Sequence, residues 1–319
     1  MKIRILSGKE VKIALPMPKA IAAMRSAFGQ FSAGRATVPL RTRLGTDRGV
    51  MLLMPAYMQE SQDLAVKLVT VYGDNPQKGL PTVSATVIIF EAETGRLRAL
   101  MEGDALTALR TGAAGGLAAD LLARKDARRV ALFGAGVQGR SQLAAVMAVR
   151  DIESVALLDH VPEMAQRLAA EIGTWPHAPQ VTVLSDSRKA VQSADIVLAA
   201  TTSLTPVFKG ADLRPGTHVT GVGSFTPDMQ EIDAETVRRA RVVVDSRQGC
   251  LAEAGDIIKA GAAIDAELGE IVNGKAPGRR DDQEITFFKS VGLAAQDAAA
   301  AAAVLASAEQ LELGIVVEL

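Results

Sequence analysis

The chain has 319 residues, of which 48% are hydrophobic, and its 35 basic side chains nearly balance its 36 acidic ones. This length exceeds the size at which a single hydrophobic core usually stops growing, so two domains are expected. The balanced charge provides no basic field to attract nucleic acid. No run of about 18 apolar residues occurs, which argues against a membrane partner and predicts a soluble protein.

The few cysteines and histidines also limit the chemistry. The single Cys250 cannot form an internal disulfide, and the first residues, MKIRILSGKEVK, lack the apolar core of a secretory signal. Both features favour the cytoplasm. The only histidines, His160, His177 and His218, are scattered without metal-ligand spacing, so no metal is predicted.

The first part of the chain predicts a sheet of its own. A short strand at residues 3–6 is followed by a helix that starts near Pro18 and extends to about residue 31. Short apolar runs separated by turn residues then predict strands, and a mixed or antiparallel sheet, at residues 38–43, 50–54, 64–72 and 82–90. A further strand at residues 97–101 leads into a long helix at 104–123.

A glycine motif follows this helix. The apolar run 130–133 leads directly into Gly134-Ala135-Gly136-Val137-Gln138-Gly139 and then into a helical segment. In a strand–turn–helix unit, the first glycine permits a tight turn. The second lets a pyrophosphate approach the backbone, and the third lets the helix pack closely on the strand. The free N–H groups of the helix N-terminus favour an anion. The motif therefore predicts a dinucleotide site.

An acidic residue strengthens this prediction. The next strand-like run, 154–158, ends in Asp159, at the position where a carboxylate would accept a hydrogen bond from the ribose 2′-hydroxyl. A carboxylate would repel a 2′-phosphate, so NAD(H) is favoured as the cofactor. The neighbouring His160 could offset that repulsion when protonated, which leaves NADP(H) open.

Strand-like runs then alternate with helical segments. The runs lie at residues 181–184, 195–200, 218–223, 241–245 and 285–288. Such alternation predicts a parallel sheet with helices on both faces, so the fold class is α/β, with a Rossmann-type doubly wound sheet plus a smaller α+β domain. We assign residues 123–292 to the dinucleotide-binding domain. Residues 1–122 and 293–319 form the second domain if the last helix packs back on the first sheet.

Two charged side chains interrupt apolar surroundings. Lys67 lies within a run that otherwise reads as a buried strand, and Arg110 interrupts an apolar helix. A buried ammonium needs a partner, so Lys67 is either a functional group or an edge-strand lysine that reaches water. Arg110 is either functional or part of a structural ion pair, and Arg41, near other arginines, taken alone reads as a surface charge. If the three residues meet at the mouth of the dinucleotide fold, two guanidinium groups could bind a substrate carboxylate while an ammonium donates to a ketimine nitrogen or a carbonyl oxygen.

Residues after the later strands are further candidates. Thr201, Thr202 and Ser203 follow one strand at its carboxyl end, where open α/β sheets bind ligands, and Gly223 ends the next. These residues either contact the nicotinamide half of a dinucleotide or form turns. Asp228 is either an acid–base group or a helix cap.

In these residues and the stretches around them, the chain resembles the ornithine cyclodeaminase/mu-crystallin family. The similar stretches span nearly the whole chain: residues 54–57 (MPAY), 67–70 (KLVT), 79–82 (GLPT), 106–111 (LTALRT), 134–138 (GAGVQ), 226–228 (TPD) and 289–292 (KSVG). The resemblance implies a homodimer in which the smaller domain binds substrate and forms the dimer. It implies that Arg41, Lys67 and Arg110 bind the carboxylate of an amino or imino acid. It also implies that Thr111 and Ser290 lie near the nicotinamide, with Gly292 in the same motif as Ser290.

Members of this family differ in chemistry, and one position helps to choose among them. The cyclodeaminases carry a catalytic aspartate two residues before the proline of segment 221–231, where this chain has Phe225. The segment SFTPDM is more similar to members that reduce Δ1-pyrroline-2-carboxylate or Δ1-piperideine-2-carboxylate. Ketimine reduction is therefore predicted. The alternatives are ornithine cyclodeamination, alanine dehydrogenation and dinucleotide-dependent binding without turnover.

Overall fold

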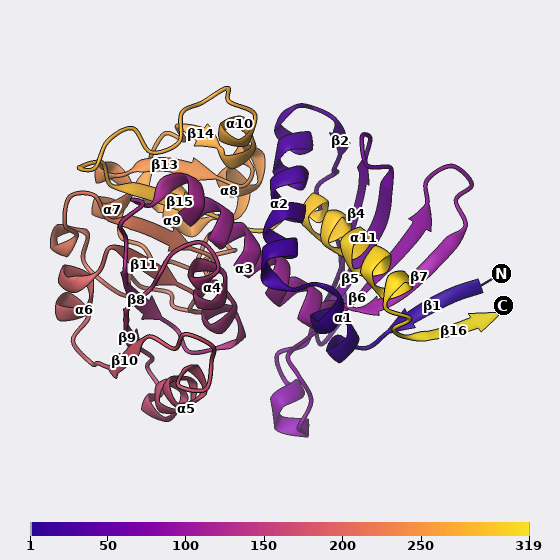
Figure 1. The fold of residues 1–319 in the computed structure, drawn as a ribbon, viewed down its shortest axis with the longest axis horizontal. Helices are drawn as coiled ribbons and strands as arrows, with labels where there is room; N and C mark the ends of the chain where they lie inside the picture. The colour runs from indigo at the N-terminus through magenta and orange to yellow at the C-terminus, as the bar shows by residue number, and fades with distance from the viewer. Residues whose placement is uncertain (1, 319) are drawn as a thin grey trace. The chain divides into compact units, whose positions relative to one another are not determined.

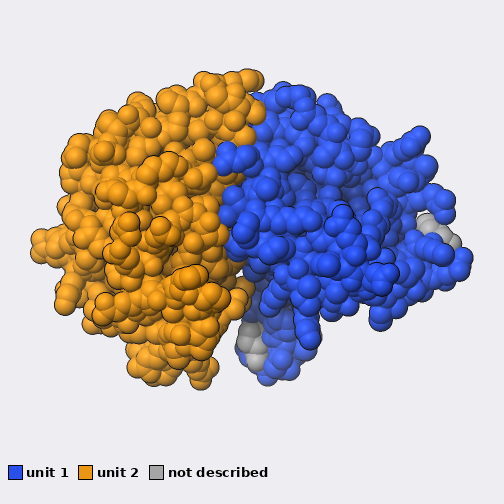
Figure 2. All heavy atoms as spheres, viewed as in Figure 1, with its two compact units in different colours: residues 1–110, 293–319 blue, residues 111–292 orange. Residues whose placement is uncertain are grey.

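The computed structural model describes residues 2–318 and divides the chain into two compact units, which Figure 2 distinguishes by colour. Unit 1 comprises residues 1–110 and 293–319, and unit 2 comprises residues 111–292. The division falls inside the long helix α3 (Gly103–Leu122), whereas the sequence places it at the end of that helix. Among the described residues, no helix is both long and apolar enough to span a bilayer.

Unit 1 is built on a mixed, mainly antiparallel sheet. Its strand order is β16-β1-β7-β6-β5-β4-β2, with β3 also paired to β4, and only β1 and β7 run parallel. The strands are β1 (Lys2–Leu6), β2 (Ala36–Thr37), β3 (Thr42–Gly45), β4 (Val50–Met58), β5 (Asp63–Val71), β6 (Val83–Glu91), β7 (Leu97–Glu102) and β16 (Ile315–Glu318). The predicted separate sheet is confirmed.

Helices cover one face of this sheet. They are α1 (Gly8–Ala14), α2 (Met17–Ser32) and α11 (Ala294–Gln310), with a 3-10 turn η1 (Asn75–Lys78) in a loop. Figure 1 shows α11 lying across the sheet, where it packs on β4, β5 and β6. Along β5 the side chains Ala65, Lys67 and Val69 are buried, whereas alternate residues are half-buried, as expected for a strand with one covered face. The last helix therefore does belong to the first unit.

Unit 2 contains an eight-stranded sheet in the order β10-β9-β8-β11-β12-β15-β13-β14, and all its strand pairs are parallel. The strands are β8 (Arg129–Phe133), β9 (Ser154–Leu158), β10 (Gln180–Val183), β11 (Ile196–Ala199), β12 (His218–Gly221), β13 (Arg241–Val244), β14 (Ala266–Glu267) and β15 (Thr286–Lys289). The central strands β11, β12 and β13 are buried along their whole length, and β11 (IVLA) is accordingly a continuous apolar run.

Helices cover both faces of this parallel sheet. They are α4 (Val137–Met147), α5 (Pro162–Ile172), α6 (Ser187–Ser193), α7 (Ala234–Arg239), α8 (Arg247–Glu253), α9 (Gly255–Ala260), α10 (Leu268–Val272) and the turn η2 (Gly210–Asp212). Along β8, Val130 and Leu132 join the core beneath α4 and α5, whereas Ala131 and Phe133 join the core beneath α6 and α7. The predicted doubly wound fold is confirmed.

The strand order of unit 2 reverses at β8. The chain runs outward from β8 to β9 and β10, then returns to β11 on the opposite side of β8. Such a reversal separates the loops that follow β8 and β11, and open α/β sheets bind ligands at this point. The glycine motif follows β8, and residues 201–203 follow β11.

Candidate active site

A buried ion cluster in unit 1 joins two of the predicted site residues. Nζ of Lys67, on β5, lies 2.7 Å from Oδ2 of Asp297 in the first turn of α11. Nε of Arg110, on α3, donates to Oδ1 of the same carboxylate at 3.0 Å. The adjacent Gln296 accepts a hydrogen bond at 2.6 Å from Nη1 of Arg110. One carboxylate of α11 therefore orients both cations.

Burial of this cluster disfavours the charged form of Lys67. The side chains of Lys67, Arg110 and Asp297 are only 3%, 7% and 2% exposed. The pKa of Lys67 is lowered to about 8, mainly by burial; the charges of Arg110 and Arg41 act in the same direction, whereas Asp297 opposes the shift. With Lys67 protonated, the trio carries one more positive than negative charge. A substrate carboxylate would neutralise this excess.

Arg41 and Gln296 extend the cluster. Arg41 precedes β3, is half-buried, and lies near enough for its charge to affect the pKa of Lys67. The structure therefore brings the three predicted carboxylate-binding residues into one electrostatic environment. Nε2 of Gln296 is buried and has no hydrogen-bond partner among the described residues, so it can donate to a bound ligand.

The sequence interpretation did not include Asp297 or Gln296. Both lie in an alanine-rich helix that is otherwise almost fully buried. The sequence did contain an indication of their importance, because two adjacent polar residues on a buried apolar helix require partners. Their partners are far away in the chain, however, and the sequence does not identify them.

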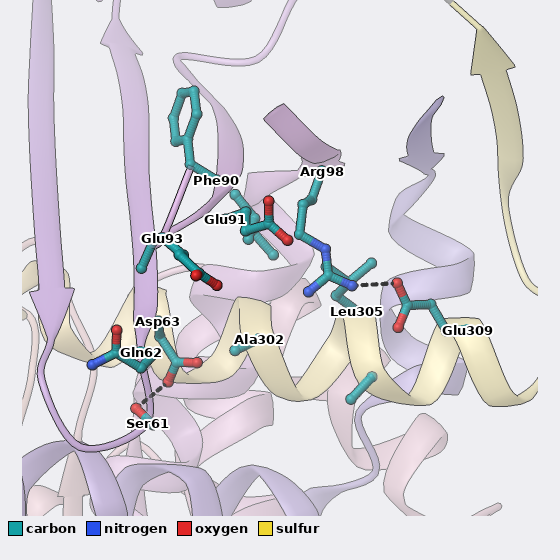
Figure 3. A pocket seen from close by; sticks show the side chains of 13 residues that line it. Ser61, Gln62, Asp63, Phe90, Glu91, Glu93, Arg98, Ala302, Leu305 and Glu309 are labelled. Carbon is teal, nitrogen blue, oxygen red and sulfur yellow. Dashed lines mark hydrogen bonds and ion pairs between the residues drawn. The ribbon is translucent and has the colours of Figure 1, made fainter. Parts of the chain in front are cut away.

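The same unit contains a pocket that holds none of these residues. It has a volume of about 410 Å³ and lies between α11 and the hairpin ends of the sheet, as Figure 3 shows. Four carboxylates line it (Asp63, Glu91, Glu93 and Glu309), and its single cation, Arg98, is paired with Glu309 at 2.7 Å. Burial also raises the pKa of Asp63. This acidic lining is unfavourable for an anionic substrate.

The glycine loop of unit 2 has the shape that a dinucleotide requires. A Cβ added at Gly134, whose φ is +97°, would lie 2.5 Å from the carbonyl oxygen of Ala200. A Cβ at Gly139 would lie 1.9 Å from the carbonyl oxygen of Gly134. A Cβ at Gly136 would meet no atom within 4 Å. The first and third glycines therefore allow close packing, whereas the second faces open space.

The start of α4 offers unused donors beside this open space. Gly136 is the N-cap and provides no side-chain cap, and Val137 is 69% exposed. Oε1 of the half-buried Gln138 is itself buried and has no hydrogen-bond partner among the described residues. A helix N-terminus with uncapped N–H groups stabilises an anion, so the residues present fit the pyrophosphate of a dinucleotide.

Asp159 lies directly beside the glycine loop. Its Oδ2 accepts a hydrogen bond from the backbone N–H of Ala135 at 2.7 Å, and its Oδ1 accepts one from Val161 at 2.9 Å. The exposed His160 lies 3.2 Å from the same carboxylate. These contacts hold Asp159 at the end of β9, where a ribose hydroxyl could bind.

The other predicted dinucleotide contacts follow strands of the same sheet. Residues 201–203 follow β11 and Gly223 follows β12, and a Cβ at Gly223 would lie 1.9 Å from the carbonyl oxygen of Thr201. Ser290, after β15, donates to Asp245 at 2.7 Å, and the backbone N–H of Gly292 does the same. The buried Asp245 thus organises the 290–292 loop, a role that the sequence interpretation missed.

Three further predicted positions differ in their surroundings. Thr111 is buried in α3, and its carbonyl oxygen accepts a hydrogen bond from Gln142 at 2.8 Å. Phe225 is 49% exposed. Asp228 is exposed in a turn where no helix begins, so the capping alternative was wrong. Its carbonyl oxygen accepts a hydrogen bond from Lys259 at 2.7 Å.

Comparison with known proteins identifies the family of the chain. The chain is 39% identical over 303 residues to a Δ1-pyrroline-2-carboxylate reductase of Bacillus cereus, covering 92% of this chain and 93% of that protein. It superposes with a TM-score of 0.93 on the Thermococcus litoralis Δ1-pyrroline-2-carboxylate reductase solved with NADH and L-proline, at 41% identity over 98% and 100% of the two chains. An archaeal alanine dehydrogenase dimer with bound NAD gives the same TM-score at 33% identity, over 100% and 99%. The sequence profile of the ornithine cyclodeaminase/mu-crystallin family matches residues 1–312, and the chain belongs to this family.

Proposed function

We propose that the protein is an NAD(P)H-dependent oxidoreductase that reduces a cyclic ketimine carboxylate, Δ1-pyrroline-2-carboxylate or Δ1-piperideine-2-carboxylate, to the cyclic L-amino acid. The observation that carries this proposal is the buried cluster of Lys67, Arg110 and Asp297, which has one excess positive charge. The reductases named above support the substrate class, because one of them was solved with both NADH and L-proline.

In this mechanism the substrate carboxylate pairs with Arg110 and Arg41, and Nε2 of Gln296 adds a neutral donor. Lys67, or a water molecule that it holds, donates a proton to the ring nitrogen. A lysine with a pKa of about 8 is protonated at neutral pH and yet releases its proton readily. When bound, the reduced nicotinamide supplies the hydride that the imine carbon accepts.

The proton matters because an iminium carbon accepts hydride more readily than a neutral imine. Lys67 therefore stabilises the transition state more than the ground state, which is the requirement for catalysis. Asp297 fixes the direction of the ammonium through the 2.7 Å contact and limits the decrease in its pKa. Asp297 thus acts through Lys67.

NAD(H) is the favoured cofactor in this proposal. The carboxylate of Asp159 would repel a 2′-phosphate, and the open side of Gly136 leaves room for the pyrophosphate. The T. litoralis and archaeal structures, with NADH and NAD, support the same assignment.

A homodimer in the cytoplasm is part of the proposal. In the part of unit 1 that the structure describes, helices pack on one face of the sheet. On the other face, Leu64 and Val66 of β5 are half-buried and pair with Phe90 and Ile88 of β6. Such a partly exposed apolar face suits a second subunit, and the archaeal alanine dehydrogenase is a dimer. The buried, unpaired Cys250 suits a reducing compartment.

The direct test is loss of nicotinamide absorbance when purified protein meets fresh Δ1-pyrroline-2-carboxylate, with NADH and NADPH tested separately. Parallel reactions contain Δ1-piperideine-2-carboxylate, pyruvate with ammonia, or ornithine. Cofactor oxidation that yields proline or pipecolate is expected. Faster turnover of pyruvate with ammonia would instead favour alanine dehydrogenation, which the archaeal relative makes the second candidate. Proline formed from ornithine would show that Phe225 does not prevent cyclodeamination.

A further inference from the structure

One cluster of buried charged side chains in unit 2, which the proposed mechanism does not use, comprises Glu231, Asp256 and Lys289. Each is 0% exposed. Nζ of Lys289 lies 2.9 Å from Oδ2 of Asp256. Burying three ionisable groups is costly unless they are paired and hydrogen-bonded, so their retention calls for a physical role.

Asp256 fixes the segment that follows β12. Its Oδ1 accepts hydrogen bonds from the backbone N–H groups of Glu231 at 2.9 Å and Ile232 at 3.0 Å. The adjacent Gly255 packs so closely on this segment that an added Cβ would lie 1.9 Å from the carbonyl oxygen of Met229. Helix α9 therefore clamps the loop that contains Phe225 and ends at Glu231.

Glu231 extends the same network to the loop that follows β11. Its Oε2 accepts a hydrogen bond from the N–H of Thr201 at 3.3 Å, and its carbonyl oxygen accepts one from Val207 at 3.0 Å. A Cβ at Gly223 would lie 1.8 Å from Oε2, so this glycine leaves space for the carboxylate. Oε1 of Glu231 has no hydrogen-bond partner among the described residues.

Lys289 connects the third loop. It is the last residue of β15 and immediately precedes Ser290. The cluster therefore joins the loops that follow β11, β12 and β15. These are the loops that carry the predicted nicotinamide-side contacts Thr201, Gly223 and Ser290.

We propose that Glu231 is a positioning residue whose state of protonation sets the arrangement of these loops and thereby the affinity for the nicotinamide end of the dinucleotide. The inference rests on the dinucleotide binding in the proposed function. When Glu231 is ionised, Oε2 is a strong acceptor for the N–H of Thr201. When Glu231 is protonated, this acceptor is weaker and the loop after β11 loses its anchor.

The charges around Glu231 make this change accessible near neutral pH. Burial raises the pKa of Glu231 to about 7, Lys289 on β15 opposes the increase, and Asp256 on α9 adds to it. With all three groups ionised the cluster has a net charge of −1, and proton uptake by Glu231 makes it neutral. Dinucleotide affinity is therefore expected to be higher at pH 8 than at pH 6.

The test is a calorimetric measurement of the Kd for NADH between about pH 6 and pH 8 in the full-length protein. Between these limits, the wild-type Kd should increase about three- to tenfold on acidification, which is the usual contribution of one hydrogen bond. Glu231→Gln, which keeps the side-chain shape but cannot ionise, should remove the dependence. The matched control, Glu235→Gln, changes an exposed carboxylate of α7 and should behave like wild type. ADP-ribose, which lacks the nicotinamide, separates this effect from changes at the adenosine end of the dinucleotide, and its Kd should not show the Glu231 dependence.

A second variant keeps the inference testable if Glu231→Gln does not fold. Asp256→Asn removes the negative charge that raises the pKa of Glu231 but keeps an oxygen for the two backbone N–H groups. The midpoint of the NADH pH profile should therefore move to lower pH. A wild-type profile without pH dependence, or a profile that Glu231→Gln leaves unchanged, would overturn the inference.

Thermal unfolding without ligand provides an independent readout. A carboxylic acid with a raised pKa in the folded state loses stabilisation as pH increases from its unfolded to its folded pKa. The wild-type Tm should therefore decrease relative to that of Glu231→Gln between about pH 4.5 and pH 7, and parallel curves of Tm against pH would contradict the titration of Glu231.

NADH binding without ketimine turnover would overturn only the proposed reaction. Turnover with pH-independent NADH binding would overturn only this inference, and absence of NADH binding would overturn both.

Discussion

Nζ of Lys67 and Nε of Arg110 contact the two oxygens of one buried carboxylate, that of Asp297, at 2.7 and 3.0 Å. Each cation thus keeps a fixed direction, yet the trio retains a net positive charge. A second carboxylate, supplied by a substrate, would balance this charge without displacing Asp297. The arrangement accounts for how the ammonium group of a buried lysine can be held by a carboxylate and still face the excess positive charge that a substrate carboxylate would balance.

Replacement of Lys67 by methionine should remove the proton donor while preserving much of the side-chain volume. We expect kcat to decrease by about 10²- to 10⁴-fold, the usual contribution of a positioned general acid. The Kd for NADH, measured by fluorescence titration, should remain close to the wild-type value, because the residues that we expect to bind the dinucleotide, the glycine loop and Asp159, do not include Lys67.

The matched control for this variant is Lys12→Met, which changes an exposed lysine of α1. It should leave kcat and NADH binding unchanged. Turnover by Lys67→Met at nearly the wild-type rate would refute the assigned role.

The pH dependence of kcat/KM should report the titration of Lys67. Burial lowers the pKa of Lys67 from 10.5 to about 8. Loss of the proton above this value removes the donor, so kcat/KM should decrease as pH increases through about 8, and this limb should be missing in Lys67→Met. The stability of the folded protein is expected to depend on pH in the opposite direction. Between about pH 8 and pH 10.5 the unfolded lysine binds the proton more strongly, so the contribution of Lys67 to stability increases with pH. A flat kcat/KM profile up to pH 10 would contradict the general-acid role.

Asp297→Asn should affect both stability and this pH profile. Removing the only anion of a buried trio leaves two uncompensated cations, which typically costs about 3–5 kcal/mol. Because the charge of Asp297 raises the pKa of Lys67, its loss should also move the kcat/KM limb to lower pH. Chemical denaturation and the pH profile test these two effects. Glu309→Gln, at the exposed end of the same helix, is the control. An Asp297→Asn profile identical to that of wild type would show that Asp297 does not act through Lys67.

Local patterns predicted most of the fold. The strand at residues 154–158 coincides with β9, because an apolar run between turn residues is a local feature. The seven-residue helix α1 was missed because it is too short for clear periodicity, although Ser7 and Glu10 form a capping box. Strand β16 was also missed, because it is stabilised by antiparallel pairing with β1 at the opposite end of the sequence.

The chemistry of the sites was less accessible. Lys67 and Arg110 stood out because each interrupts an apolar segment. Their shared partner Asp297 did not, because the contact between Arg110 and Asp297 spans 187 residues. Glu231 and Asp256 were missed for the same reason, since their environment exists only after three loops meet. Residue type and spacing indicate which side chains need partners, whereas the folded chain determines the partners.

Asp159 should determine the preference between the two dinucleotides. Its carboxylate, held by the N–H groups of Ala135 and Val161, would repel a 2′-phosphate. Wild-type kcat/KM should therefore favour NADH over NADPH by more than about tenfold, equivalent to 1.4 kcal/mol. Asp159→Ser should reduce this preference, mainly by weakening the use of NADH. In the control, His160→Asn, the preference should increase slightly, because a cationic imidazole no longer offsets the repulsion. A wild-type preference for NADPH would contradict this role of Asp159.

Two alanine substitutions in the glycine loop should separate cofactor binding from folding. A Cβ at Gly136 would meet no protein atom within 4 Å, and its φ of −78° suits any residue. Gly136→Ala should therefore keep the wild-type Tm but weaken NADH binding by at least about tenfold, since the methyl group occupies the space that a pyrophosphate needs. A Cβ at Gly139 would lie 1.9 Å from the carbonyl oxygen of Gly134, so Gly139→Ala should lower the free energy of unfolding by about 1–3 kcal/mol or more. Calorimetric titration and thermal unfolding of both variants measure the difference. If Gly136→Ala bound NADH as tightly as wild type, the dinucleotide could not approach the chain on the open side of this glycine.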